Sequence, residues 1–189
     1  MKTKSDIERV RLNRSLADID AVRFTHKFPG WEGHKGMTLS GVEAPLLQVF
    51  RGFENVDAVH GIFGANTGKV LAKVKVAVYD GMGYAWIDNE RGRLRLMINR
   101  QYLQKGRKID IYLDVIHELT HIRQHMKGID LWDERYRYVD RPTEIEAYGN
   151  AVTEARRLGM PLKEIKRYLR VPYIPKENFE RLFRNLGLE

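Results

Sequence analysis

The feature that most constrains the fold is a change in the spacing of apolar residues near residue 110. Before it, residues 70–80 alternate apolar and charged side chains, and residues 84–88 and 93–99 read as two more short strands separated by turn-forming residues. After it, apolar residues recur every three or four positions, as they do on one face of a helix. We therefore predict an α+β fold in which a small antiparallel sheet precedes and packs on a long helix.

Further helices are predicted at both ends of the chain. A helix over residues 6–22 and a loop over residues 26–36 would form an N-terminal extension, residues 1–36. A short helix is expected across the forties, capped by Ser40. Residues 160–189 read as a basic pair of amphipathic helices. With 189 residues, 43% of them hydrophobic, the chain 1–189 is expected to fold as a single domain.

Composition narrows the chemistry that the chain can use. Cysteine is absent, so any metal must be held by imidazole and carboxylate groups. No apolar run is long enough for a membrane span, and the first residues lack the apolar core of a secretory signal, so we expect a cytoplasmic protein without membrane contact. The net charge of +8 is concentrated at the two ends. Basic ends can attract nucleic acid, although solvated helix faces have the same composition.

The predicted long helix carries the motif HELTH at residues 117–121. Asp110 can cap its start, and Gly128 stands where a helix favours a left-handed terminator. Residues four apart are neighbours on a helix, so His117 and His121 can reach one cation together. Glu118 is displaced from His117 by about 100 degrees, which leaves its carboxylate beside the cation, where it can act as a general base toward water. The motif therefore predicts a metal site with its own base.

A catalytic zinc takes three protein ligands and leaves one position open, so the third ligand must come from elsewhere. The downstream candidates are His125, Asp130, Asp133, Glu134, Asp140, Glu144 and Glu146. His125 lies one further turn along the same helix, about 6 Å away along the axis, which is too far to share the ion easily.

A second helix is predicted from Pro142 to the region of Gly159. Its apolar face, which includes several alanines, should pack on the HELTH helix. Glu144 lies on that inward face, where a buried carboxylate needs a partner such as a cation. Glu146 lies on the other face, so we predict Glu144 as the third ligand.

The motif HELTH, followed some two dozen residues later by a glutamate on a helix, resembles the gluzincin group of zinc metallopeptidases. The stretch EIEAYGNAV is similar to the ExxA signature of the minimal gluzincins and of the ImmA/IrrE-type peptidases that cut bacterial repressors. The resemblance covers roughly residues 90 to 158. In that signature the glutamate three positions before the alanine is a ligand, which again gives Glu144, before Ala147.

The resemblance implies a zincin-like arrangement: an active-site helix, a backing helix with the third ligand, and a small sheet whose edge strand pairs with an extended peptide. Residues 93–99 are the expected edge strand. The chain departs from the ImmA/IrrE-type pattern at Tyr148, where those sequences tend to have asparagine. Thermolysin-like enzymes have an acidic residue there that orients a ligand histidine, and Asp114 is a candidate for that role here, toward His117.

A peptidase also needs a donor that stabilises the oxyanion. The candidates are Tyr136, Tyr138, Tyr148 and His125. Tyr148 is preferred because it shares the inward face with Glu144.

Two functions follow from the sequence. The first is zinc-dependent hydrolysis of a peptide bond in a peptide or protein substrate, with Glu118 as the general base. The alternative is a nucleic-acid or protein binding module in which zinc is structural and the basic ends provide the contact. A structural zinc normally takes four protein ligands, so a fourth ligand would favour the alternative.

Overall fold

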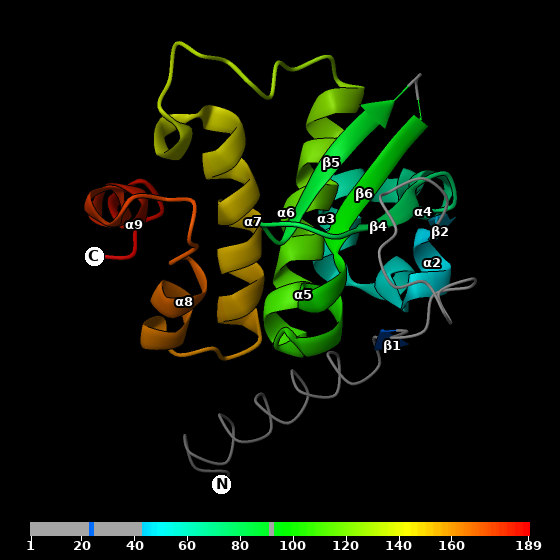
Figure 1. The fold of residues 1–189 in the computed structure, drawn as a ribbon, viewed down its shortest axis with the longest axis horizontal. Coiled ribbons are helices and arrows are strands. Elements are labelled where there is room, and N and C mark those ends of the chain that lie inside the picture. Colours follow the sequence, from blue (N-terminus) through cyan, green and yellow to red (C-terminus); the bar gives the residue numbers. More distant parts are fainter. Residues whose placement is uncertain (1–22, 25–42, 91–92) are drawn as a thin grey trace, which may run out of the picture.

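The computed structural model describes residues 23–24, 43–90 and 93–189. The helix predicted over residues 6–22, the loop over residues 26–36 and the cap at Ser40 lie outside these ranges. Within them, the protein is α+β: a small mixed sheet packs against a set of helices (Figure 1).

Two long helices lie side by side and form the framework of the site (Figure 1). Helix α6 spans Lys108–Met126 and α7 spans Pro142–Arg157. The predicted start of α7 and the predicted ends of both helices are confirmed: Pro142 is the first residue of α7, and Gly128 and Gly159 have φ of 72° and 77° just beyond the two helices. Asp110 lies in the first turn of α6 and does not cap it.

The contact between α6 and α7 uses small residues and buried hydrogen bonds. Ala151 and Ala155 are fully buried on α7, which allows close approach of the two helices. The Tyr112 hydroxyl of α6 donates to Glu154 Oε1 at 2.6 Å, and Asn150 Nδ2 of α7 donates to Thr120 Oγ1 at 3.1 Å. The inward face predicted for α7 is confirmed.

The main sheet has four strands in the order β2-β4-β6-β5. They are β2 (Glu43–Pro45), β4 (Lys75–Tyr79), β5 (Ala85–Glu90) and β6 (Arg93–Asn99). The prediction of an antiparallel sheet is wrong in one place, because β4 and β6 are parallel. The chain leaves β4, passes the position next to it, forms β5, and returns as β6 between the two. Periodicity reports burial along one strand and carries no information about which strand becomes its neighbour.

Strand β5 is an edge of this sheet, whereas β6 lies between β4 and β5. Residues 96–98 of β6 are all at most 4% exposed, which requires cover on both faces. The prediction that residues 93–99 form the edge strand is therefore wrong. The strand β5 pairs only with β6 among the described residues, and it lies against α6.

The remaining elements are short. The helix expected across the forties begins later than predicted: Glu43–Pro45 is strand β2, and α2 covers only Leu46–Val49. Helices α3 (Asp57–Phe63) and α4 (Thr67–Leu71) follow, so part of the alternating segment before residue 75 is helical. The others are β1 (Arg23–Phe24), β3 (Phe50–Arg51), α5 (Arg100–Lys105) and the 3-10 turns η1 (Phe53–Asn55), η2 (Gly64–Asn66), η3 (Tyr138–Asp140) and η4 (Lys176–Asn178).

The C-terminal pair is present as α8 (Leu162–Tyr168) and α9 (Phe179–Asn185). Both lie on the side of α7 that faces away from the sheet (Figure 1). Ile165, Leu182 and Phe183 are at most 1% exposed, so this pair closes the core as its amphipathic pattern indicates. No helix in the described part of the chain has the length and apolar character needed to cross a membrane.

Candidate metal centre

Three predicted ligands come together where α6 meets the first turn of α7. His117 and His121 project from adjacent turns of α6, and their Nε2 atoms lie 2.9 Å apart. Glu144 Oε2 lies 3.5 Å from His117 Nε2 and 3.6 Å from His121 Nε2. All three residues are buried, and the predicted convergence of His117, His121 and Glu144 is confirmed.

These separations fit a single small cation. A tetrahedral zinc with ligand bonds of about 2.0–2.1 Å places its ligand atoms about 3.3–3.4 Å apart, and the three observed separations bracket that value. Glu144 Oε2 is buried and makes no hydrogen bond to a described residue. A buried carboxylate oxygen without a donor is costly, and a cation between it and the two imidazoles would remove that cost. The donor set therefore suits a metal ion.

A hydrogen-bonded chain behind His121 fixes the orientation of its ring. His121 Nδ1 lies 2.8 Å from Gln124 Oε1, so the neutral ring donates its Nδ1 proton to the amide and leaves the Nε2 lone pair for a cation. Gln124 is fully buried, and its Nε2 donates to the Thr143 carbonyl at 3.0 Å and to Glu146 Oε2 at 2.7 Å. Gln124 thus supports one ligand from α6 while it is itself held by the helix that carries another.

His117 is supported by packing. Its ring lies against Tyr148, with centroids 4.3 Å apart, and its Nδ1 makes no hydrogen bond to a described residue. The role suggested for Asp114 toward His117 is not found. Asp114 instead accepts the hydroxyls of Tyr102 at 2.6 Å and Tyr168 at 2.8 Å, because its position on α6 faces α5 and α8.

Glu118 lies beside the three ligands, in a pocket of about 170 Å³ that they share. The pocket is lined by Ala85, Trp86, Ile87, His117, Glu118, His121, Leu131, Trp132, Tyr138, Glu144 and Tyr173. One wall is strand β5 and another is the segment after α6. Trp132 and Tyr173 are 63% and 53% exposed, so aromatic surface surrounds the mouth.

The protonation behaviour of the group follows from burial and mutual contact. Burial lowers the pKa of His117. Burial also opposes the charged forms of His121 and Glu144, but their contact prevails: the pKa of His121 is raised to about 9 and that of Glu144 is held well below its usual range. Burial raises the pKa of Glu118 to about 8, near the range suited to a general acid–base group at neutral pH, and a nearby dication would lower it again.

The tyrosines around the site form a hydroxyl network. Tyr148 OH lies 3.1 Å from Tyr138 OH and 3.2 Å from Tyr173 OH. Tyr148 is only 3% exposed and does not line the pocket, whereas Tyr138 and Tyr173 do. Of these three, the sequence did not single out Tyr173, which lies in the loop before α9 and carries no motif. The structure thus places Tyr148 behind the site and Tyr173 at its mouth.

The rejected ligand candidates have other partners. His125 Nε2 lies 2.9 Å from Asn89 Nδ2 of β5, and Glu146 forms an ion pair with Arg123 at 2.6 Å. Asp133 and Asp140 pair with Arg135 and Arg181. Asp130 accepts the backbone N–H of Trp132 at 2.9 Å, and Glu134 is exposed. Tyr136, a former candidate donor, is exposed and does not line the pocket.

Tested against family models, curated proteins and solved structures, the chain matches none of them.

Proposed function

We propose that the protein is a zinc-dependent hydrolase of peptide bonds, with His117, His121 and Glu144 as the metal ligands and Glu118 as the general base. The observation that carries the proposal is the convergence of three buried ligand atoms beside a second buried acid, Glu118, that faces a pocket. The arrangement of α6, α7 and the sheet supports a zincin-like description of the fold.

The donor set favours zinc among the common cations. Two imidazole nitrogens and one carboxylate oxygen form one of the usual catalytic zinc sets, whereas magnesium and calcium prefer oxygen ligands throughout. A zinc ion bound there would supply Lewis acidity, lowering the pKa of water and polarising a carbonyl group.

The chain's own residues would share the proton transfers and the stabilisation of charge. Glu118 is placed to accept a proton from water in the pocket and to return it to the departing amine. Tyr173 is better placed than Tyr148 to donate a hydrogen bond to the developing oxyanion, since it lines the same pocket as the ligands. Tyr148 would then position Tyr173 through the contact of their hydroxyls.

Strand β5 is a suitable template for an extended peptide. It is the edge strand next to the metal centre among the described residues, and Ala85, Trp86 and Ile87 form one wall of the pocket. A peptide added to this edge would pass the Glu118 carboxylate, and the aromatic residues at the mouth would contact its side chains.

The binding-module alternative has less support. A structural zinc normally needs a fourth protein ligand, and the group found among the described residues has three. Several basic residues of the C-terminal region also serve the fold. Arg167 pairs with Asp110, and Arg181 pairs with Asp140.

Metal content and peptidase activity of matched variants test the proposal. The chain offers an internal control, because Glu144→Gln and Glu146→Gln make the same change two residues apart on α7. We expect wild type and Glu146→Gln to bind one equivalent of zinc, and Glu144→Gln and His117→Ala to lose it. Glu118→Gln should keep the metal and lose cleavage of casein or of a peptide library.

Two results would contradict the proposal in different ways. Full activity in Glu118→Gln would remove the assigned mechanism and leave the metal site standing. Equal zinc binding in Glu144→Gln and wild type would remove Glu144 as the third ligand and, with it, the basis of the hydrolase assignment.

A further inference from the structure

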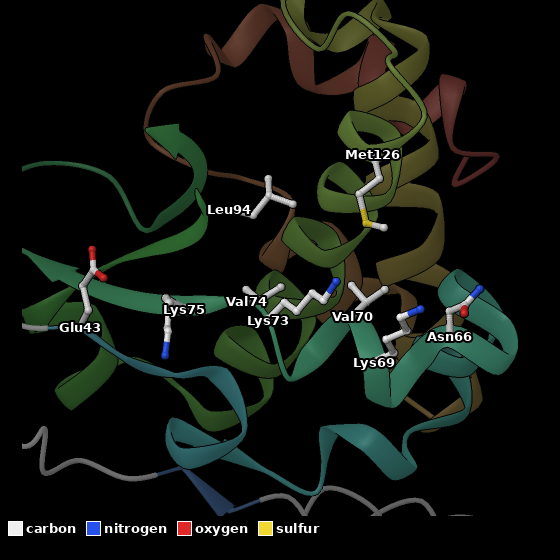
Figure 2. A pocket seen from close by; sticks show the side chains of 9 residues that line it. All are labelled: Glu43, Asn66, Lys69, Val70, Lys73, Val74, Lys75, Leu94 and Met126. Carbon is white, nitrogen blue, oxygen red and sulfur yellow. The ribbon is translucent and has the colours of Figure 1, made fainter. Parts of the chain in front are cut away.

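A second and larger pocket lies away from the metal centre, between α4, the end of α6 and the strands β2, β4 and β6. Its volume is about 670 Å³, within the range of roughly 300–1,000 Å³ typical of ligand sites. The residues that line it are Glu43, Asn66, Lys69, Val70, Lys73, Val74, Lys75, Leu94 and Met126 (Figure 2). None of them belongs to the metal group or to the smaller pocket.

The interior of this pocket is apolar. Val70 and Val74 are 7% and 1% exposed and form part of its wall. The side chains of Leu94 and Met126 lie across from them (Figure 2). Met126 is 55% exposed, and methionine is a side chain that adapts its shape to different apolar partners.

The charge around the pocket is positive and is not neutralised by acidic side chains among the described residues. Lys69, Lys73 and Lys75 are exposed, and none forms an ion pair within the described ranges. The single acidic lining residue, Glu43, is already paired with Arg95 at 2.9 Å. The apolar wall is therefore flanked by three lysines whose charges are not neutralised by an acid within the described ranges.

We propose that this pocket binds an acidic amphipathic peptide segment of a partner protein. Apolar side chains of the segment would enter between Val70, Leu94 and Met126, and its carboxylates would pair with the lysines. The ammonium groups of Lys69 and Lys73 lie on the side of Asn66, whereas that of Lys75 points away on the other side (Figure 2). One carboxylate cannot meet both sides, so the arrangement favours a segment with several acids over an amphiphile with one head group.

The site is independent of the proposed hydrolysis and is tested by direct binding. The probe is a fluorescein-labelled twelve-residue peptide in which glutamate and aspartate alternate with leucine, titrated with the full chain by fluorescence anisotropy. The test variant carries Lys69→Glu, Lys73→Glu and Lys75→Glu. The control carries Lys105→Glu, Lys163→Glu and Lys176→Glu, three exposed lysines outside the pocket, and has the same net charge.

We expect saturable binding to wild type and to the control variant, and binding at least about tenfold weaker in the test variant, since each exposed ion pair contributes a modest amount and three are reversed. Met126→Ser should also weaken binding without changing the net charge. A peptide with lysine at every acidic position should not bind.

Three results would overturn the inference. The first is an absence of binding to wild type. The second is equal weakening in the two triple variants, which would indicate general charge attraction. The third is displacement of the probe by laurate at equal concentration, which would indicate a site for a single-headed amphiphile. Zinc content and peptidase activity on a short peptide should be the same in both triple variants, so failure here is distinguishable from failure of the proposed hydrolase.

Discussion

Replacement of Gln124 by methionine tests whether the metal centre depends on the hydrogen-bonded chain behind it. Gln124 is fully buried, accepts from His121 Nδ1 and donates to Thr143 and Glu146. Methionine has a similar volume and leaves no large cavity, but its thioether cannot replace the amide. The change therefore removes the polar support of one ligand and keeps the packing.

The expected magnitude has two separable parts. Loss of the acceptor that holds a ligand histidine weakens metal binding about 10- to 100-fold, which corresponds to about 1.4–2.8 kcal/mol of binding free energy. Loss of the two bonds donated by Gln124 Nε2 lowers the free energy of unfolding of the metal-free protein by about 1–3 kcal/mol, at about 0.5–1.5 kcal/mol for each bond.

Both parts can be measured on one preparation. Zinc affinity is obtained by competition with a chromogenic chelator, and stability by denaturant unfolding of the metal-free protein. Glu146→Gln is the matched control, because its amide oxygen can still accept from Gln124 Nε2 while the charge is removed. We expect the control to bind zinc within about threefold of wild type, because Gln124 still supports His121.

Zinc affinity of Gln124→Met equal to that of wild type, in a variant that remains folded, would refute the reasoning. It would show that packing alone orients His121, as it does for His117 against Tyr148.

Four further substitutions have distinct expected outcomes. Tyr173→Phe should lower kcat of peptide hydrolysis about 100-fold with zinc content unchanged. Tyr148→Phe should keep kcat within about fivefold and lower the free energy of unfolding by about 1 kcal/mol. Steady-state kinetics separates the two variants, and a larger loss of kcat in Tyr148→Phe than in Tyr173→Phe would restore Tyr148 as the donor. Burial raises the pKa of Asp114 from 3.8 to about 7. Between these pH values the folded chain binds a proton that the unfolded chain lacks, so the free energy of unfolding falls as pH rises. Denaturant unfolding of Asp114→Asn between pH 4.5 and 8 should lack this fall, and identical pH profiles of the two proteins would contradict the assignment. Gly128→Ala should reduce stability by about 1 kcal/mol without changing zinc affinity, since φ of 72° disfavours a side chain; a stabilised variant in denaturant unfolding would be the opposite of this expectation.

The parts of the fold that the sequence predicted well are governed by local rules. The apolar stripe of α6, the proline that begins α7 and the glycines beyond both helices depend on residues within one or two turns of each other. Glu144 was identified in the same way, because its helical face fixes which way it points once α7 packs on α6. The three residues that converge at the candidate metal centre could thus be identified without coordinates.

The sheet shows where local rules stop. The pattern of residues 93–99 predicts a strand. It does not predict that β4 and β5 become the neighbours of that strand, because strand pairing depends on the fold of the whole chain. The consecutive apolar residues Met97 and Ile98 are a hint in the sequence, because a strand that is apolar on both faces is usually internal. Both residues are buried in the structure. The wrong choice of edge strand moved the expected peptide path from β5 to β6.

The supporting residues of the site needed both kinds of information. Gln124 is three residues after His121, so its contact with that ring was within reach of helical spacing. Its second contact, with Thr143 and Glu146, exists only because α7 begins beside the end of α6. Tyr173 is the extreme case, since it lines the pocket from a segment beyond α8, where its hydroxyl contacts that of Tyr148. A candidate ligand can be identified from its own helix, whereas a residue that another element brings to the site becomes visible only when the elements are assembled.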